Sequence, residues 1–411
     1  MNNSNRYRFV IFINIFLVRL CVGIIWASAG PLLPLLIDEF GISRSTAGWF
    51  ASIAPLTIAA ISLPVNSLVN RLGLKRIFTI GSFLLGMGIF TFFLTDYISA
   101  LFFRICFAAG TAIIIPVATA ITAEWFTSRE LPILNGIGMS AANVGNGIAF
   151  LATVPLAAWL SWKAPIVIYA AFALLCAVCW VFIGRERKDG PETVTDISGI
   201  PDTRPDLPLK KILTNKVAIL MTLTVTLSWA LANAINSWLP DYYYTAFGIP
   251  LNQASWILSI YTVSATIASI GGGILSVRMG RRKPFIIISG LFSGLAALCA
   301  ILFNSPALIY ISIALFGAFF GIQISSTFTI PMEMPGMSVR SGVIVLSMMQ
   351  VGGNFGNFVS PLLVGTLYDS TGSYLPGFIT FIVLSFGLLI AGLLIPETGP
   401  AAQKSPSVSN A

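Results

Sequence analysis

The stretch Phe40-Gly-Ile-Ser-Arg-Ser-Thr-Ala-Gly-Trp-Phe-Ala-Ser52 returns later in the chain as Phe247-Gly-Ile-Pro-Leu-Asn-Gln-Ala-Ser-Trp-Ile-Leu-Ser259. Trp49 recurs as Trp256, which is a shift of 207 residues. The same shift relates further pairs along the chain: Arg71 and Arg278, Gly73 and Gly280, Gly110 and Gly317, Ser140 and Ser347, and Gly145 and Gly352. A repeat of half the chain predicts two halves of similar structure.

The composition is typical of a membrane protein. Of the 411 residues, 56% are hydrophobic and only 9% are charged, whereas a soluble domain has about 25% charged residues. Apolar runs of about 20 residues can span a bilayer as helices, and the chain lacks the long alternating segments of a membrane β-barrel. Twelve apolar runs begin near Phe9, Ser45, Ile77, Ser99, Leu131, Pro165, Val217, Ala254, Pro284, Ala307, Val339 and Leu375. The sequence therefore predicts an all-α membrane protein with twelve transmembrane helices.

A polar stretch divides these runs into two sets of six. We expect an N-terminal six-helix bundle at 1–184, a cytoplasmic linker at 185–214, and a C-terminal six-helix bundle with a short cytoplasmic tail at 215–411. Because each half has an even number of spans, both halves have the same orientation. They form a parallel internal repeat about an axis along the membrane normal.

The distribution of charge predicts the orientation in the membrane. The net charge is +8. Arg19 and Arg104 fall inside spans and Arg44 and Lys163 in loops on one side, so the other Lys and Arg residues lie on the opposite side. Positive residues favour the cytoplasmic side. We therefore expect a multi-pass protein of the cell (inner) membrane with both termini in the cytoplasm, in contact with lipid and not with nucleic acid.

Several classes of function lack the residues they need. The chain has no histidine, and its five cysteines all lie in apolar runs, so neither a metal site nor a cofactor is expected. No nucleophile and base occur in an arrangement that suggests an enzyme. We expect a protein that functions as a monomer.

Two loops resemble a known family motif. The loop after the second span reads Asn66-Ser-Leu-Val-Asn-Arg-Leu-Gly-Leu-Lys-Arg76, and the loop after the eighth reads Gly273-Ile-Leu-Ser-Val-Arg-Met-Gly-Arg-Arg282. Both resemble the loop motif Gly-x-x-x-Asp-Arg-x-Gly-Arg-Arg of the major facilitator superfamily, although Asn70 and Val277 replace its acid. The resemblance implies two six-helix bundles and transport by alternating access. The gating residues expected from these loops are Arg71, Gly73, Arg278 and Gly280.

Acidic residues at two span ends suggest further gate contacts. Glu124 and Glu333 end the fourth and tenth spans, and each is followed by an arginine, Arg129 or Arg340. We expect salt bridges there on the cytoplasmic side; the alternative is that these charges are simply solvated at helix ends.

Two arginines lie within the apolar spans. Arg19 is about ten residues into the first span, roughly 15 Å along a helix, and Arg104 lies in the fourth. A charged residue at the bilayer centre costs about 2.5–3.5 kcal/mol on insertion scales, and no acid inside the apolar runs is placed to neutralise Arg19. We interpret both as substrate-binding cations. The alternatives are a helix–helix contact for Arg19, and either snorkelling or bonding to backbone carbonyls for Arg104.

Polar side chains on shared helix faces are candidate ligands. Asn233 and Asn236 share a face of the seventh span, and Gln350 and Asn354 share a face of the eleventh. The other candidates for the substrate site are Trp26, Tyr261 and Gln323. Each could instead make a hydrogen bond between helices. Trp26 is followed by Gly30, Pro31 and Pro34, so we expect the first helix to be bent or broken there.

Within the superfamily, two segments resemble the cyanate permease family (CynX/NimT). These are Ser28-Ala-Gly-Pro-Leu-Leu-Pro34 and Ala234-Ile-Asn-Ser-Trp-Leu-Pro240. The resemblance implies a secondary active or facilitative transporter of a small anion, cyanate-like or a small organic acid. Without a central carboxylate, uniport, exchange or proton transport with the substrate is favoured over a proton carrier in the protein. The alternatives are an exporter of drug-like amphipathic compounds and a membrane sensor that does not transport.

Overall fold

The protein is described here from a computed structural model. It covers residues 3–62, 64–93, 96–127, 130–185, 208–334 and 338–399, and all regular secondary structure in these ranges is helical. The linker expected at 185–214 falls mostly on 186–207, outside the described residues.

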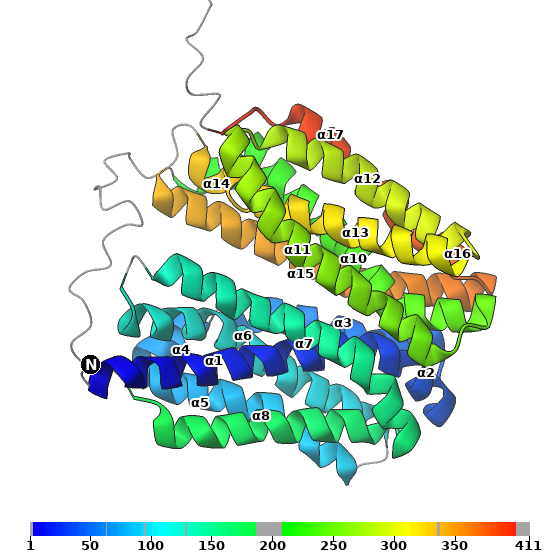
Figure 1. Ribbon diagram of the computed structural model, residues 1–411, viewed down its shortest axis with the longest axis horizontal. Helices are drawn as coiled ribbons and strands as arrows, with labels where there is room; N and C mark the ends of the chain where they lie inside the picture. Colours follow the sequence, from blue (N-terminus) through cyan, green and yellow to red (C-terminus); the bar gives the residue numbers. More distant parts are fainter. Residues whose placement is uncertain are drawn as a thin grey trace, which may run out of the picture. The chain divides into compact units, whose positions relative to one another are not determined.

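The helices of the first half are long and run alongside one another, as Figure 1 shows for α1, α5, α6 and α8. They are α1 (Asn3–Ala27), α2 (Ala29–Phe40), α3 (Arg44–Ser62), α4 (Val65–Leu72), α5 (Leu74–Leu85), the 3₁₀ helix η1 (Gly86–Phe92), α6 (Tyr97–Trp125), α7 (Leu131–Trp159) and α8 (Lys163–Ile183).

The helices of the second half follow the same order of long spans. They are α9 (Leu209–Leu213), α10 (Lys216–Phe247), α11 (Leu251–Met279), α12 (Lys283–Leu302), α13 (Pro306–Thr327), α14 (Ile330–Glu333), α15 (Val339–Thr371), α16 (Leu375–Ser385) and α17 (Gly387–Leu394). Among the described residues, twelve helical segments are long and apolar enough to cross a membrane. Six end by Ile183 and six begin from Lys216, which confirms the predicted all-α fold with twelve spans.

The described helices form two compact units. The first contains the helices up to α8 together with Asn236–Ser259 and Pro361–Gly372. The second contains α9, the start of α10 up to Ile235, Ile260–Ser360 and the helices from Ser373 onward. The long helices α10, α11 and α15 therefore each contribute residues to both units.

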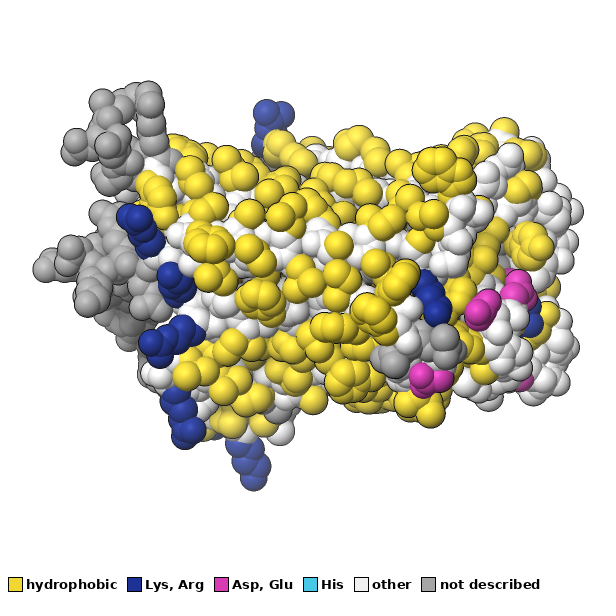
Figure 2. Space-filling view, turned by 90° about the horizontal axis from the view of Figure 1, so that it is seen from below, with side chains coloured by type: hydrophobic (Ala, Val, Ile, Leu, Met, Phe, Trp, Pro, Cys, Tyr) yellow, Lys and Arg dark blue, Asp and Glu magenta, His cyan; other side chains and the backbone are white. Residues whose placement is uncertain are grey.

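Loops alternate between two sides of the membrane because every span crosses it. We call the side of Arg8, Lys75 and Arg282 the basic side, and the side of Arg44 and Lys163 the opposite side. On the face shown in Figure 2, hydrophobic side chains cover the middle, and most of the visible Lys and Arg side chains gather at one end. This apolar middle is the surface that a helical membrane protein presents to lipid.

The first span is interrupted at Ser28, as the Gly-Pro sequence predicts. Helix α1 ends at Ala27 and α2 begins at Ala29, while the Ser28 hydroxyl donates a hydrogen bond to the Ile25 carbonyl at 2.9 Å. Pro31 has no N–H group and cannot continue the ladder of helical hydrogen bonds. The carbonyl groups at the end of α1 therefore need other partners.

The internal repeat is also visible in the packing of each unit. A Cβ atom on Gly145 of α7 would lie 2.3 Å from the Leu20 carbonyl oxygen of α1. A Cβ atom on the repeat-related Gly352 of α15 would lie 2.5 Å from the Thr226 hydroxyl of α10. Both glycines thus allow the fifth span of a half to approach the first span of that half closely.

Substitution of Gly145 tests this packing. We expect Gly145→Ala to lower the free energy of unfolding by about 1–3 kcal/mol, because the methyl group meets a backbone oxygen that cannot rotate away. Gly147→Ala on the same helix is the matched control, since nothing lies within 4 Å of its added Cβ. Thermal unfolding of the purified protein in detergent measures both, and equal shifts in the two variants would contradict the close contact.

Candidate functional site

Arg19 of α1 is a buried cation whose charge no described carboxylate balances. Its side chain points between α6 and α7 and is 8% exposed. Nη2 donates to the Thr119 hydroxyl at 2.7 Å and to the Ile115 carbonyl at 3.2 Å. Nε is buried and has no hydrogen-bond partner among the described residues. This guanidinium therefore keeps bonding capacity that the surrounding protein does not use.

Gly138 of α7 makes room for this guanidinium. A Cβ atom at Gly138 would lie 2.6 Å from Nη1 of Arg19, which is closer than side chains pack. On the same helix, nothing lies within 4 Å of a Cβ atom at Gly136 or Gly147. Of these three glycines, Gly138 is therefore the one whose missing side chain makes room for Arg19.

Arg104 of α6 lies in a different environment. Its Nε donates to the Phe50 carbonyl at 3.2 Å, Nη1 to the Ile25 carbonyl at 2.6 Å and Nη2 to the Trp26 carbonyl at 3.0 Å. The guanidinium carbon lies 4.9 Å from the centroid of the Phe107 ring. Arg104 is only 5% exposed. Each of its nitrogens is bonded, so it ties α6 to α3 and to the interrupted end of α1.

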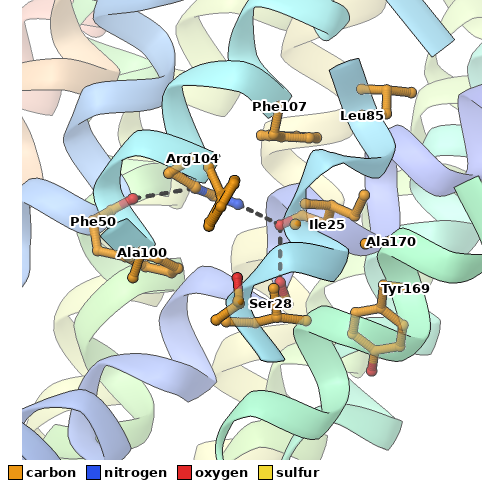
Figure 3. A pocket seen from close by; sticks show the side chains of 13 residues that line it. Ile25, Ser28, Phe50, Leu85, Ala100, Arg104, Phe107, Tyr169 and Ala170 are labelled. Atoms are coloured by element: carbon orange, nitrogen blue, oxygen red, sulfur yellow. Dashed lines mark hydrogen bonds between the residues drawn. The ribbon is translucent and has the colours of Figure 1, made fainter. Parts of the chain in front are cut away.

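A small pocket lies beside Arg104 in the first unit (Figure 3). Leu85, Phe107 and Tyr169 are among the side chains that line it, and the bonds from Arg104 to the Phe50 and Ile25 carbonyls run along one side. Its lining is mostly apolar, and the Arg104 nitrogens are already bonded to the backbone.

The two arginines do not form one cluster. Arg19 bonds α6 at Ile115 and Thr119, and Ile115 is eleven residues beyond Arg104. At 1.5 Å per residue this is about 16 Å along the helix. The structure thus places the two predicted substrate cations at different depths of the first unit, and their role in substrate binding remains a prediction.

The polar candidates of the second unit make mainly helix–helix contacts. The Asn233 amide donates to the Asn357 carbonyl of α15 at 2.7 Å, and Gln323 of α13 accepts from the Ser228 hydroxyl of α10 at 2.7 Å. Tyr261 stacks on Phe316, with ring centroids 5.2 Å apart. These contacts correspond to the structural alternative for each residue.

The remaining polar candidates are more accessible. Gln350 is exposed, and Asn354 is partly exposed with its amide donating to the Gln350 carbonyl at 3.0 Å. In the first unit, Trp26 packs partly against the buried core, and Asn236 has a buried side-chain oxygen without a partner among the described residues.

The two loop motifs turn at glycine. Gly73 and Gly280 have φ values of +80° and +61°, a region that favours glycine. Arg71 and Arg278 are exposed. Their gating role stays a prediction, because the described side-chain contacts of the second loop are made by Arg282.

Arg282, at the end of the second motif, forms the strong contact on the basic side. It donates through Nη2 and Nε to the two oxygens of Glu333 at 2.7 and 3.0 Å, and through Nη1 to the Ser276 hydroxyl at 2.6 Å. The hydrogen bonds to Glu333 raise the pKa of Arg282 above its ordinary value. Glu397 accepts the Arg282 backbone N–H at 2.7 Å. Sequence reasoning named Glu333 but missed this partner.

The structure does not describe the side chains of the two arginines that the sequence predicts as partners of Glu124 and Glu333. Arg129 and the Arg340 side chain lie outside the described residues. In the first unit, an ion pair on this side joins Arg8 to Glu130 at 3.1 Å. Hydrogen bonds from the Thr127 backbone and hydroxyl, with the nearby Arg8, lower the pKa of Glu130.

Sequence reasoning also missed a cluster on the opposite side, which we call the Arg44 cluster: Arg44, Asp241, Tyr368 and Asp369. Arg44 Nε donates to Asp241 at 3.1 Å, and its guanidinium carbon lies 3.9 Å from the Tyr368 ring centroid. Asp369 accepts the backbone N–H groups of Arg44 and Ser45 at 3.1 and 2.9 Å. The signal was present, since Arg44 is one of two cations in the loops of that side.

Comparison with known proteins decides the family. The model of the Major Facilitator Superfamily matches residues 15–248 and 220–410, which together cover nearly the whole chain. The chain belongs to this superfamily. It is therefore a membrane transporter of the major facilitator type, and the family resemblance of the two loop motifs is confirmed.

Relatives in the superfamily cover most of this chain. An uncharacterized transporter of Bacillus subtilis, YybO, is 26% identical over 385 residues, 87% of this chain and 86% of the relative. A probable sulfoacetate transporter of Cupriavidus necator, SauU, is 22% identical and covers 88% of each chain. A nitrite extrusion protein of Bacillus subtilis is 21% identical and covers 86% of each chain.

Solved structures of the superfamily share the fold. A bacterial homologue of the human lysosomal transporter Spinster, in an inward-facing conformation, matches with a TM-score of 0.74 and 16% identity over 94% of this chain and 96% of that one. The nucleoside transporter NupG matches with a TM-score of 0.75 and 14% identity over 93% of this chain and 99% of that one. At these identities the likeness concerns the fold alone.

The different bonding of the two arginines predicts different effects of the same substitution. We expect Arg104→Lys to lower the free energy of unfolding by roughly 2–3 kcal/mol, since an ammonium cannot replace a fork that reaches three carbonyls. Arg19→Lys, the matched variant, removes fewer bonds and should change stability by less. Thermal unfolding in detergent compares the two variants. A larger loss of stability for Arg19→Lys would show that Arg19, and not Arg104, is the arginine that holds the helices together.

Proposed function

We propose that this transporter carries a small anion across the cell membrane by alternating access, and that Arg19 binds the charge of that anion. Both termini lie in the cytoplasm in this proposal, because the basic side carries most of the Lys and Arg residues. The anion is cyanate-like or a small organic acid.

The observation that carries the proposal is the unbalanced charge of Arg19. A guanidinium in low dielectric attracts an anion much more strongly than it would in water. Its planar fork matches a carboxylate or another planar oxyanion through two parallel hydrogen bonds. Nε of Arg19 is buried without a partner, and Nη1 faces Gly138. An anion bound there would satisfy both the charge and the unused donors.

The names of the relatives support the same ligand class. Sulfoacetate and nitrite are both small oxyanions, and the proteins named for them align along most of this chain. Cyanate belongs to the same class by size and charge, so we retain it among the anions to be tested. Gln350 and Asn354 remain candidate ligands because their side chains are accessible.

The proposed transport cycle exchanges contacts on the two sides. The two halves, 1–184 and 215–411, would rock about the anion as parallel repeats do. On the basic side, the turns at Gly73 and Gly280 and the pair of Arg282 with Glu333 would hold helix ends in one state. Arg104 would keep the interrupted α1–α2 segment in place while the halves move.

Uptake into proteoliposomes tests the proposal. The panel is labelled sulfoacetate, nitrite, nitrate, cyanate and a short carboxylate, with wild type beside Arg19→Ala. We expect saturable uptake of at least one anion and a fall in transport efficiency of about tenfold to hundredfold in the variant, since charge-assisted hydrogen bonds are lost. Lys163→Ala removes one positive charge from the start of α8 and should transport like wild type.

The other outcomes are informative. Anion uptake that survives in Arg19→Ala would make this arginine structural. Folded protein that carries amphipathic drugs but no anion would favour an exporter. Anion binding without counterflow would favour a sensor.

A finer test changes the space around Arg19 and leaves its charge unchanged. Gly138→Ala places a methyl group 2.6 Å from Nη1, so the guanidinium must turn away from its present position. We expect the KM for the anion to rise several-fold while thermal stability stays close to wild type, because the clash is with the flexible end of a side chain. Gly136→Ala, with open space around its Cβ, is the control. An unchanged KM in Gly138→Ala would separate this position from the anion site.

A further inference from the structure

We propose that the Thr119 hydroxyl is an internal ligand of Arg19, which an anion with two oxygens in one plane must displace and a linear anion need not. Thr119 is then a residue that determines which anions bind well. The inference rests on the proposed function, because it takes Arg19 as the residue that binds the anion. The residues that carry it all lie in the first unit.

Helix α6 uses both N–H bonds of one nitrogen of Arg19. Nη2 donates to the Thr119 hydroxyl at 2.7 Å and to the Ile115 carbonyl at 3.2 Å. This nitrogen of a guanidinium carries two hydrogens, so two acceptors use its donors fully. Nε is enclosed without a partner among the described residues, and Nη1 faces α7 at Gly138. The donors that remain are therefore on Nε and Nη1.

The shape of the guanidinium limits how an anion can use these donors. The planar group offers two forks, each made of two parallel N–H bonds. One fork joins Nε and Nη2, and the other joins Nη1 and Nη2, so Nη2 belongs to both. An anion can place two oxygens on either fork only if Nη2 gives up one of its present acceptors.

Thr119 is the acceptor that can leave. The Ile115 oxygen belongs to the backbone of α6 and cannot turn without unwinding the helix. The Thr119 hydroxyl belongs to a side chain, and threonine in a helix divides between two χ1 rotamers. The hydroxyl also donates to the Ile115 carbonyl at 3.2 Å, which directs its lone pairs toward other donors. The hydroxyl can thus accept from Arg19 in one rotamer and turn away in the other.

Thr119 also lies where a ligand can approach. Thr119 and Ile115 are exposed one turn apart on the same face of α6, whereas Arg19 is only 8% exposed. On the side of α7, Gly138 places no side chain against Nη1. An anion that approaches along this face of α6 therefore meets the hydroxyl before it meets the buried guanidinium.

The exchange affects two kinds of anion differently. A carboxylate or nitrite holds two oxygens side by side, so it can replace Thr119 on Nη2 and bond Nη1 at the same time. A linear anion such as cyanate presents one end atom, which can bond Nη1 while Thr119 stays in place. Competition from the hydroxyl therefore weakens the binding of the first kind and leaves the second kind unaffected.

An internal ligand is useful to a carrier, which has to release what it binds. When the anion leaves, the hydroxyl returns to Nη2, so the buried cation does not lose an acceptor without replacement. The free energy of binding is reduced by the hydrogen bond that the anion had to break. Thr119 thus favours release of an anion that Arg19 would otherwise hold tightly.

Uptake of labelled acetate, nitrite and cyanate into proteoliposomes tests the exchange. Valine has the shape of threonine without the hydroxyl. In Thr119→Val we expect the KM for acetate and nitrite to fall about fivefold to tenfold, because a hydrogen bond to a charged group no longer has to be broken. The KM for cyanate should stay close to wild type. Thr119→Ser keeps the hydroxyl and should behave as wild type with all three anions.

Two further variants control for effects on the helix. Thr122 of α6 also donates to the carbonyl four residues before it, Ala118, at 2.8 Å. Thr122→Val therefore removes a hydroxyl of the same kind away from Arg19, and every KM should stay at the wild-type value. Thr119→Val combined with Arg19→Ala should transport no better than Arg19→Ala alone, because the hydroxyl acts through the guanidinium.

Thermal unfolding gives the same comparison at equilibrium. A bound anion raises the Tm according to its Kd. Acetate should therefore raise the Tm of Thr119→Val at lower concentrations than it raises the Tm of wild type, while cyanate should act on both proteins alike.

The results separate this proposal from the proposed function. A KM for acetate and nitrite that is unchanged or higher in Thr119→Val, with uptake that still depends on Arg19, would overturn the internal ligand and leave anion transport standing. An equal fall in the KM for cyanate would overturn the distinction between the two kinds of anion. Folded wild type that neither binds nor carries any of the three anions would overturn both proposals.

Discussion

Polar groups inside a bilayer must find their partners within the chain, because lipid offers none. The interruption of the first span at Ser28 leaves carbonyl groups of α1 without helical donors, and Arg104 supplies those donors from α6. A guanidinium is suited to this because its fork can reach three oxygens at once. One cation thus satisfies the carbonyl groups at the end of α1, where α2 begins, and also ties α3 to this point through the Phe50 carbonyl.

The features that sequence reasoning could predict are those encoded locally. Spans follow from runs of apolar residues, and the break in the first span follows from Gly30 and Pro31. The turns at Gly73 and Gly280 follow from the loop motif and have the positive φ that glycine permits. Because the sequence repeats, the spans and the glycine turns occur twice. Gly145 and Gly352 could therefore be related before any contact between helices was known.

The features that sequence reasoning could not predict depend on pairing across long separations. Arg19 and Arg104 look alike as single cations in apolar runs, yet one bonds carbonyl groups and the other keeps unused donors. Backbone carbonyls exist at every residue and leave no pattern in a sequence. The ion pair of Arg44 with Asp241 joins residues 197 positions apart. No local rule could select Asp241 among the several acids near helix ends.

The membership of the first unit has a consequence for synthesis of the protein. That unit includes Pro361–Gly372, so it is incomplete when the ribosome has finished α8 at Ile183. At about 5–20 residues per second, the remaining segments arrive roughly 10–40 s later. During this delay, the surfaces of α2 and α3 that will contact α10 and α15 face lipid or the insertion machinery. The nascent chain therefore passes through a long-lived intermediate in which part of its later interior is temporarily membrane-exposed.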